Sequence, residues 1–260
     1  MAIPHLIPRT DATAEQLASA TNVLILGNSL GTDTHLWDLA LPTLAAAHTI
    51  VRWDLPGHGQ AAVAPEDFTL AELASAVIAM ADELGISTFD YAGVSVAGGV
   101  ALELALAYPE RVKHSAVVCS SPYFGGTDAW AERIALVESS GTVAVVTTTP
   151  ARWFAPDFPA KDPGTTEKLL SMVAATQDAG YIQVCNALGS YDARPFLADI
   201  KIPVLVISGE VDPAATPEAG AQIAHEVPGA RQVIIPGTSH QAVVEKPLDV
   251  ARTLTDFFAE

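Results

Sequence analysis

Short apolar runs rich in β-branched residues alternate along this sequence with longer segments of helical period. The apolar runs are 22–27, 49–54, 89–94, 115–121, 204–209 and 232–236. Between them, apolar side chains recur at three- and four-residue steps in 36–46, 70–84, 97–108, 217–225 and 248–258. Strands that are continuously apolar must be covered on both faces, as in a parallel sheet flanked by helices. The alternation therefore predicts a doubly wound, mostly parallel α/β sheet.

The alternation stops between residues 122 and 199, where the sequence shows helix-like segments and no convincing strand. The ligand crevice of an open α/β sheet lies beyond the carboxyl ends of its strands, so an insertion after a strand end would roof that crevice. We expect residues 1–121 and 200–260 to form the α/β core, and residues 122–199 to form a helical cap inserted after the strand that ends near Ser121. A separate small domain with no role in the site is the alternative.

Composition excludes several classes of protein. The chain has 260 residues with 13 basic and 30 acidic side chains, a formal net charge of −17, and its lysines and arginines are scattered. Such a charge repels phosphate backbones and anionic lipids, so neither nucleic acid nor membrane is an expected partner. No run approaches the ~18 consecutive apolar residues of a membrane helix, and Pro4, Pro8 and Arg9 interrupt the region where a signal peptide would be apolar. We expect a cytoplasmic monomer or small homo-oligomer.

The strongest chemical signal is a serine at a strand-to-helix junction. Residues 93–97 read Gly-Val-Ser-Val-Ala, directly after a predicted strand and before a predicted helix. A nucleophile elbow requires this context, because small neighbours leave room for a strained serine backbone and the helix start favours a developing oxyanion. The pattern predicts Ser95 as a nucleophile. Ala97 stands where the usual G-x-S-x-G pattern has glycine.

A serine hydroxyl needs a base to take its proton, and the base needs an orienting acid. In this architecture the acid and then the histidine follow the serine along the chain. Of the seven histidines, His240 is the one that lies late in the chain in a loop after a predicted strand. Asp212 lies just past the preceding predicted strand, ahead of Pro213, where a turn residue can point inward. Glu210, at the strand end, is the rival acid.

Two backbone amides are expected to form an oxyanion hole, those of Val96 after the nucleophile and of Leu30 in the loop after the first central strand. Cys119 and Cys185 are too few for a disulfide framework or a zinc cluster and lie in apolar surroundings, which predicts buried thiols. The sequence shows no metal-ligand cluster, Walker loop or dinucleotide fingerprint, so we expect neither a metal nor a cofactor.

Together these residues resemble the active site of an α/β-hydrolase. Longer stretches resemble the 3-oxoadipate enol-lactonases of aromatic-acid breakdown. The resemblance runs from about residue 22 to the end. Its matching stretches are 26–37, 52–59, 108–112, 118–121, 127–133, 152–156, 172–176, 180–181, 209–213 and 216–217. The sequence departs from the family at Ala97, at Pro56 where arginine is usual, and before residue 22, where the usual opening β-hairpin is not recognisable.

The resemblance implies hydrolysis of 3-oxoadipate enol-lactone to 3-oxoadipate through Ser95, His240 and Asp212. Because this substrate carries a free carboxylate, Arg133 and Arg152, both in the roof, are candidates to bind it. The aromatic residues that we expect to line the pocket are Trp130, Trp153 and Tyr181. A general carboxylesterase or a cofactor-free haloperoxidase-like hydrolase would use the same triad. A slow ligand-binding protein with a hydrolase fold is the alternative from another class.

Overall fold

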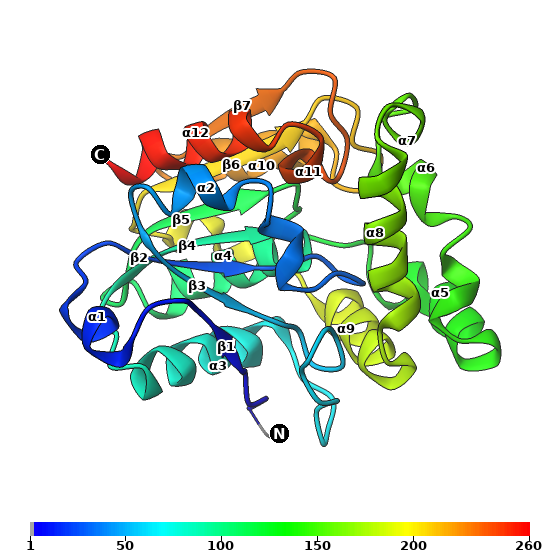
Figure 1. The fold of residues 1–260 in the computed structure, drawn as a ribbon, viewed down its shortest axis with the longest axis horizontal. Helices are drawn as coiled ribbons and strands as arrows, with labels where there is room; N and C mark the ends of the chain where they lie inside the picture. Colours follow the sequence, from blue (N-terminus) through cyan, green and yellow to red (C-terminus); the bar gives the residue numbers. More distant parts are fainter. Residues whose placement is uncertain (1–2) are drawn as a thin grey trace.

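Seven strands form a single sheet in the computed structural model, which describes residues 3–260 (Figure 1). The sheet order is β1-β3-β2-β4-β5-β6-β7. The strands are Pro8–Arg9 (β1), Val23–Gly27 (β2), Thr49–Trp53 (β3), Phe89–Val94 (β4), Val112–Val118 (β5), Val204–Gly209 (β6) and Arg231–Ile235 (β7). Strands β2 to β7 pair in parallel, and β1 pairs antiparallel with β3. The predicted α/β fold with a mostly parallel sheet is confirmed.

Helices cover both faces of the sheet because its central strands are apolar throughout. Every residue of β2, β4 and β6 is buried. Figure 1 shows α2 (Leu41–Leu44) and α12 (Pro247–Phe258) together on one face. On the other face, α4 (Val96–Ala107) packs against β4, β5 and the neighbouring helix α3 (Leu70–Glu83). On the same face, α10 (Pro217–Glu226) packs against β6. The remaining core helices are Ala14–Ser19 (α1), the 3₁₀ helix Thr34–Trp37 (η1) and Ala242–Glu245 (α11).

Two predicted elements differ from the structure. The helix expected over 36–46 is interrupted, with η1 and the short α2 in its place, because Pro42 has no N–H to donate to the carbonyl four residues earlier. The strand expected over 115–121 ends at Val118, because Cys119 has a φ of +45°, outside the range of an extended strand. It also begins earlier, at Val112, since the half-buried Lys113 and His114 interrupt the apolar run without ending the strand.

Between β5 and β6 the described chain forms helices and one isolated β-bridge, between Tyr123 and Asp192. The helices are Thr127–Ser140 (α5), Thr142–Val145 (η2), Thr149–Trp153 (α6), Phe158–Lys161 (α7), Pro163–Ala175 (α8), Asp178–Ser190 (α9) and Arg194–Asp199 (η3). Figure 1 shows α5 to α8 standing beyond the carboxyl ends of β4 and β5. The helices thus lie over the edge of the sheet where a crevice is expected.

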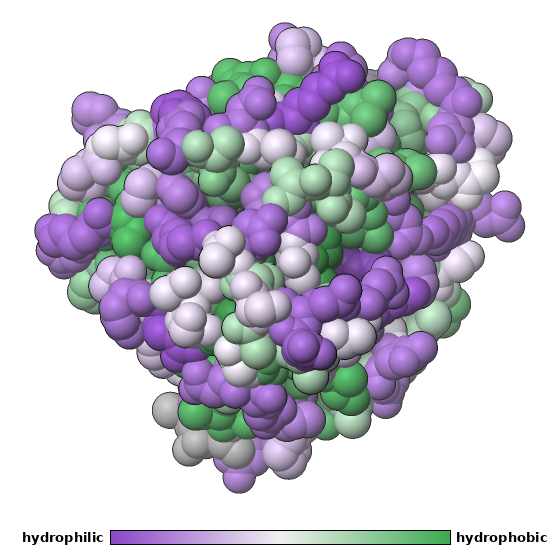
Figure 2. All heavy atoms as spheres, turned by 60° about the vertical axis from the view of Figure 1, so that its left-hand side comes forward, coloured by the Kyte–Doolittle hydropathy of each residue, from purple (hydrophilic) through white to green (hydrophobic). Residues whose placement is uncertain are grey.

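On the face drawn in Figure 2, hydrophilic side chains spread between smaller hydrophobic patches. None of the helices in residues 3–260 is long and apolar enough to cross a membrane.

Candidate functional site

Ser95 lies at the sharp turn between β4 and α4. Its backbone has φ +58° and ψ −117°, a conformation that is strained for a residue with a Cβ. The turn is possible because Gly93 lacks a side chain, since a Cβ there would lie 2.0 Å from the carbonyl oxygen of Ala97. The Ser95 side chain makes no capping bond to α4 and instead lines a cavity.

His240 and Asp212 form a chain of hydrogen bonds to Ser95. The His240 Nε2 atom lies 3.0 Å from Ser95 Oγ, and His240 Nδ1 lies 2.8 Å from Asp212 Oδ2. The other carboxylate oxygen of Asp212 accepts the N–H groups of Ala214 at 2.8 Å and Ala215 at 2.9 Å. These bonds fix the orientation of a carboxylate that is only 3% exposed. An imidazole held in this way can accept a proton from the serine.

The rival acid, Glu210, lies elsewhere. Its side chain is exposed and accepts the backbone N–H of Gly237 at 2.8 Å. Glu210 therefore braces the turn after β7, while Asp212 is the carboxylate that contacts His240.

Alanine fits at position 97 because the residue that faces it is a glycine. A Cβ added to Gly27 would lie 2.6 Å from the Ala97 Cβ and 2.5 Å from the Tyr91 hydroxyl. The methyl group of Ala97 fills the space that a side chain at position 27 would otherwise need. The departure from the usual pattern is thus accommodated without opening the elbow.

The two amides predicted for an oxyanion hole are both available. Val96 is the first residue of α4, and Leu30 follows β2 in the loop 28–33. Within residues 3–260, neither amide donates a hydrogen bond to a protein acceptor. An N–H group at a helix start also carries the favourable end of the helix dipole. Both groups could therefore stabilise an oxyanion formed beside Ser95.

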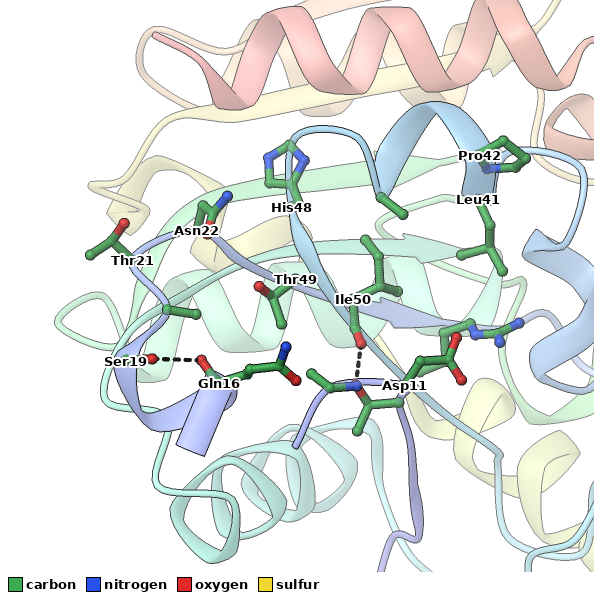
Figure 3. Close-up of a pocket in the computed structure, with 15 residues that line it drawn as sticks. Asp11, Gln16, Ser19, Thr21, Asn22, Leu41, Pro42, His48, Thr49 and Ile50 are labelled. Atoms are coloured by element: carbon green, nitrogen blue, oxygen red, sulfur yellow. Dashed lines mark hydrogen bonds between the residues drawn. The ribbon is translucent and has the colours of Figure 1, made fainter. Parts of the chain in front are cut away.

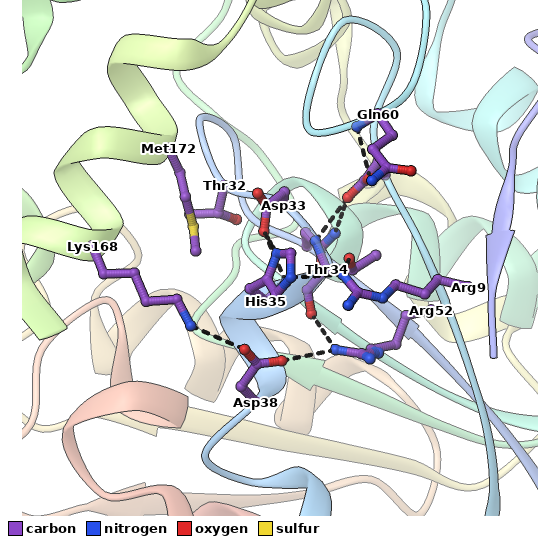
Figure 4. Close-up of polar contacts among 12 residues, drawn as sticks. Arg9, Thr32, Asp33, Thr34, His35, Asp38, Arg52, Gln60, Lys168 and Met172 are labelled. Atoms are coloured by element: carbon purple, nitrogen blue, oxygen red, sulfur yellow. Dashed lines mark hydrogen bonds and ion pairs between the residues drawn. The ribbon is translucent and has the colours of Figure 1, made fainter. Parts of the chain in front are cut away.

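Polar contacts hold the chain around Leu30 in place (Figure 4). The buried Asp54 carboxylate accepts the N–H of Thr34 at 2.7 Å and of Gln60 at 3.2 Å. Burial raises the pKa of Asp54, and these two hydrogen bonds oppose the shift. Figure 4 also shows Asp38 between Arg52, at 3.0 Å, and Lys168 of α8, at 2.9 Å. The loop is thereby fixed to β3 and to the helices above the sheet.

A cavity of about 390 Å³ lies between the serine and the helices above it. Ser95, Leu30 and His240 line it, together with all five residues that the sequence singled out for substrate binding: Arg133, Arg152, Trp130, Trp153 and Tyr181. Sequence reasoning did not assign the other lining residues, six of which lie in loops and four in helices, because none of them belongs to the triad or to the oxyanion hole. They are Ser29, Tyr123, Phe124, Gly125, Ala129, Thr149, Val173, Leu188, Ala214 and Ala215.

The two arginines bring positive charge to this cavity without acidic partners. Arg133 donates a hydrogen bond to the Tyr181 hydroxyl at 3.0 Å. In the described chain, Arg152 makes no side-chain hydrogen bond, and neither arginine makes an ion pair. Burial lowers the pKa of Arg152, and the charge of Arg133 adds to the effect, yet a guanidinium stays charged in proteins. The arrangement can therefore hold an anionic group.

A second cavity, of about 720 Å³, lies between α1, α2 and β3 and contains none of the predicted site residues (Figure 3). Its histidine, His48, contacts the Leu44 carbonyl through Nδ1 at 3.3 Å, and burial lowers the pKa of this imidazole. No nucleophile in its lining faces a base as Ser95 faces His240. Nowhere in residues 3–260 do three or more His, Cys, Asp or Glu side chains cluster so as to hold a metal ion.

Comparison with known proteins agrees with this geometry. Residues 22–247 match the family described as alpha/beta hydrolase fold. The chain belongs to the α/β-hydrolase family. It is 32% identical to 3-oxoadipate enol-lactonase 2 of Acinetobacter baylyi over 224 residues, which cover 86% of this chain and 84% of the relative. It is 28% identical to a pimeloyl-[acyl-carrier protein] methyl ester esterase of Edwardsiella ictaluri, with 90% and 92% covered.

A solved structure extends the similarity to three dimensions. The enol-lactonase from Burkholderia xenovorans LB400 matches this hydrolase with a TM-score of 0.92 and 30% identity, over 98% of this chain and 96% of that one. The resemblance to the 3-oxoadipate enol-lactonases is therefore confirmed. The relatives include both lactone and ester hydrolases. The comparisons therefore establish that this chain is an α/β-hydrolase, and they leave its substrate to be identified.

Proposed function

We propose that this hydrolase opens the lactone ring of 3-oxoadipate enol-lactone to give 3-oxoadipate, a step of the β-ketoadipate pathway. The observation that carries the proposal is a single cavity that combines the Ser95–His240–Asp212 chain with two arginines lacking acidic partners. The first feature suits an ester or lactone carbonyl, and the second suits a substrate that carries a carboxylate. The similarity to 3-oxoadipate enol-lactonases supports the same substrate.

In the first half of the reaction, Ser95 Oγ attacks the carbonyl carbon of the lactone. His240 Nε2, 3.0 Å from that oxygen, takes the proton, and Asp212 stabilises the imidazolium that results. The N–H groups of Val96 and Leu30 stabilise the negative charge on the carbonyl oxygen. The ring C–O bond then breaks. Its oxygen leaves as an enolate, a more stable leaving group than an alkoxide. The enolate takes the proton from His240 and becomes the ketone, so that a neutral imidazole and an acyl-enzyme remain.

In the second half, water releases the product. His240 takes a proton from the water, whose oxygen attacks the acyl carbon bound to Ser95. The same two amides stabilise the second oxyanion. The bond to Ser95 Oγ then breaks, and His240 returns the proton to the serine. The products are 3-oxoadipate and the free enzyme.

The roof of the cavity provides specificity in this proposal. We assign residues 122–199 the role of a cap, because α5, α6 and α9 carry the arginines and aromatic residues that line the cavity. Arg133 and Arg152 bind the carboxylate beside the lactone, and Trp130, Trp153 and Tyr181 enclose the ring. The Tyr181 hydroxyl accepts a hydrogen bond from Arg133 and so sets the direction of that guanidinium.

The proposal is tested by measuring enol-lactone turnover by the wild type and by Ser95→Ala. Because the variant removes the nucleophile and leaves the rest of the cavity intact, we expect kcat to fall by at least about 10³-fold. Circular dichroism shows whether the variant is folded. A wild type that is inert towards the lactone but hydrolyses nitrophenyl esters would instead identify a general carboxylesterase, and binding without turnover would identify a ligand-binding protein.

Arg152→Ala tests the assignment of the carboxylate site. We expect KM to rise roughly tenfold or more for the acidic lactone and little for a neutral ester, because a charge-assisted hydrogen bond is lost only with the former. Steady-state kinetics with both substrates provides the comparison. Equal effects on the two substrates would remove Arg152 from the binding site.

A further inference from the structure

The side chain of Glu245 accepts hydrogen bonds from two distant parts of the backbone. Its Oε2 atom accepts the N–H of Ser239 at 2.6 Å, and its Oε1 atom accepts the N–H of Ala155 at 2.7 Å. Ser239 directly precedes His240, and Ala155 follows Arg152 and Trp153 after one further residue. One carboxylate thereby joins the loop that carries His240 to the segment directly after α6, whose last two residues line the cavity.

A second contact joins the same two segments on the other side of His240. The backbone N–H of Gln241 donates a hydrogen bond to the carbonyl oxygen of Trp153 at 3.0 Å. The residues before and after His240 are therefore both tied to residues 153–155. Trp153 and Ala155 are buried, so water does not compete freely for these bonds.

The carboxylate of Glu245 depends on these amides for its stabilisation. It forms no ion pair with a lysine or arginine in residues 3–260. Burial raises the pKa of Glu245, and the hydrogen bonds from Ala155 and Ser239 act in the opposite direction. Hydrogen bonds to an ionised acceptor are roughly twice as strong as neutral ones. A partly buried carboxylate without a cation therefore holds the two amides firmly in place.

We propose that Glu245 is a positioning residue for both parts of the site. Through Ser239 it holds His240 at the distance needed for proton transfer from Ser95. Through Ala155 it holds Arg152 and Trp153 in place next to the carboxylate of the bound substrate. This inference rests on the hydrolase function proposed above. Loss of the first contact lowers kcat for every substrate, whereas loss of the second raises KM for substrates that carry a carboxylate.

Two substitutions separate these effects. Glu245→Ala removes both hydrogen bonds. Glu245→Gln keeps the shape of the side chain, but its one oxygen can accept only one of the two N–H groups, because the NH₂ group is a donor. The glutamine variant should therefore retain part of what the alanine variant loses. Kinetics with a neutral ester and with an ester that carries a carboxylate, normalised to active sites titrated with a serine-directed phosphonate, measures both effects.

For Glu245→Ala we expect kcat to fall about tenfold with both esters and KM to rise about tenfold with the acid-bearing ester alone. Glu245→Gln should lose less kcat/KM on the acid-bearing ester than Glu245→Ala. Glu110→Ala is the matched control, since Glu110 is exposed and has no side-chain partner in the described chain, and its kinetics should equal those of the wild type. A merely structural role would reduce the titrated sites and leave kcat per site and KM unchanged.

The outcomes distinguish the two proposals. If the wild type hydrolyses both esters through Ser95 and the Glu245 variants keep wild-type kcat and KM per titrated site, the role of Glu245 is wrong and the proposed function stands. An equal rise in KM for both esters also overturns the role. If the wild type hydrolyses neither ester, the proposed function is wrong and this inference is wrong with it.

Discussion

The elbow depends on two positions at which a side chain is absent. Gly93 allows the carbonyl of Ala97 to approach, and Gly27 leaves room for the Ala97 methyl group. The sequence shows Ala97 as a departure from the usual pattern, but it does not show which residue compensates, because positions 27 and 97 are far apart in the chain. Since the two residues share one space, their substitutions should not be independent.

Gly27→Ala should therefore destabilise the protein by roughly 1–3 kcal/mol, because the new Cβ would lie too close to Ala97 and to the Tyr91 hydroxyl. Ala97→Gly should cost about 1 kcal/mol, the usual cost of glycine in a helix. The double variant should be more stable than the sum of the two losses predicts, since one of the close contacts is gone. Urea unfolding of all four proteins measures the difference, and strictly additive losses would show that the two positions are not coupled.

The sequence predicts elements well where their apolar pattern is local. It identifies β4 and β6 to the residue because both are buried along their whole length. It misplaces β5, whose start carries the charged Lys113 and whose end depends on the φ angle of Cys119. The Ser95, His240 and Asp212 positions follow from chain order and strand ends, whereas Glu245 acts through backbone amides 6 and 90 positions away, and no sequence motif marks such a contact.

A tight packing of the loop 54–61 against α9 places a histidine in an entirely buried position. The Gln177 N–H, just before α9, donates to the Gly57 carbonyl at 2.9 Å, and the ring of His58 stacks on Tyr181 with 6.5 Å between centroids. Burial lowers the pKa of His58 to about 4, well below the ordinary value of about 6.5. The folded protein thus holds this imidazole neutral, while the unfolded chain binds a proton below about pH 6.5.

The free energy of unfolding of the protein should consequently depend on pH. Because the unfolded chain binds more protons between about pH 6.5 and pH 4, the free energy of unfolding falls as the pH falls through this range, by roughly 2 kcal/mol at pH 5 from His58 alone. In His58→Gln this contribution is absent, so the loss between pH 7.5 and pH 5 should be about 2 kcal/mol smaller than in the wild type. Urea unfolding at both pH values tests this, with the exposed His225→Gln as control. Equal losses in the wild type and His58→Gln would contradict it.

The molecule as a whole is negatively charged, whereas the cavity contains positive charge. The chain has a formal net charge of −17, yet Arg133 and Arg152 bring positive charge into the cavity. An anionic substrate is therefore repelled at long range and attracted at short range. Ionic strength separates the two effects, because the Debye length shrinks from about 30 Å at 0.01 M to about 8 Å at 0.15 M. Salt weakens the distant repulsion much more than the contact with the arginines.

We therefore expect kcat/KM for the acid-bearing lactone to rise roughly two- to fivefold when the ionic strength increases from 0.01 M to 0.15 M. A neutral ester should show no such increase, since it is not repelled, and it controls for effects of salt on the enzyme itself. Arg152→Ala should lower kcat/KM for the lactone at both ionic strengths and leave the direction of the salt effect unchanged, because the acidic surface remains. A decrease with salt in the wild type would mean that the two cavity arginines, rather than the net charge, govern the approach of the substrate.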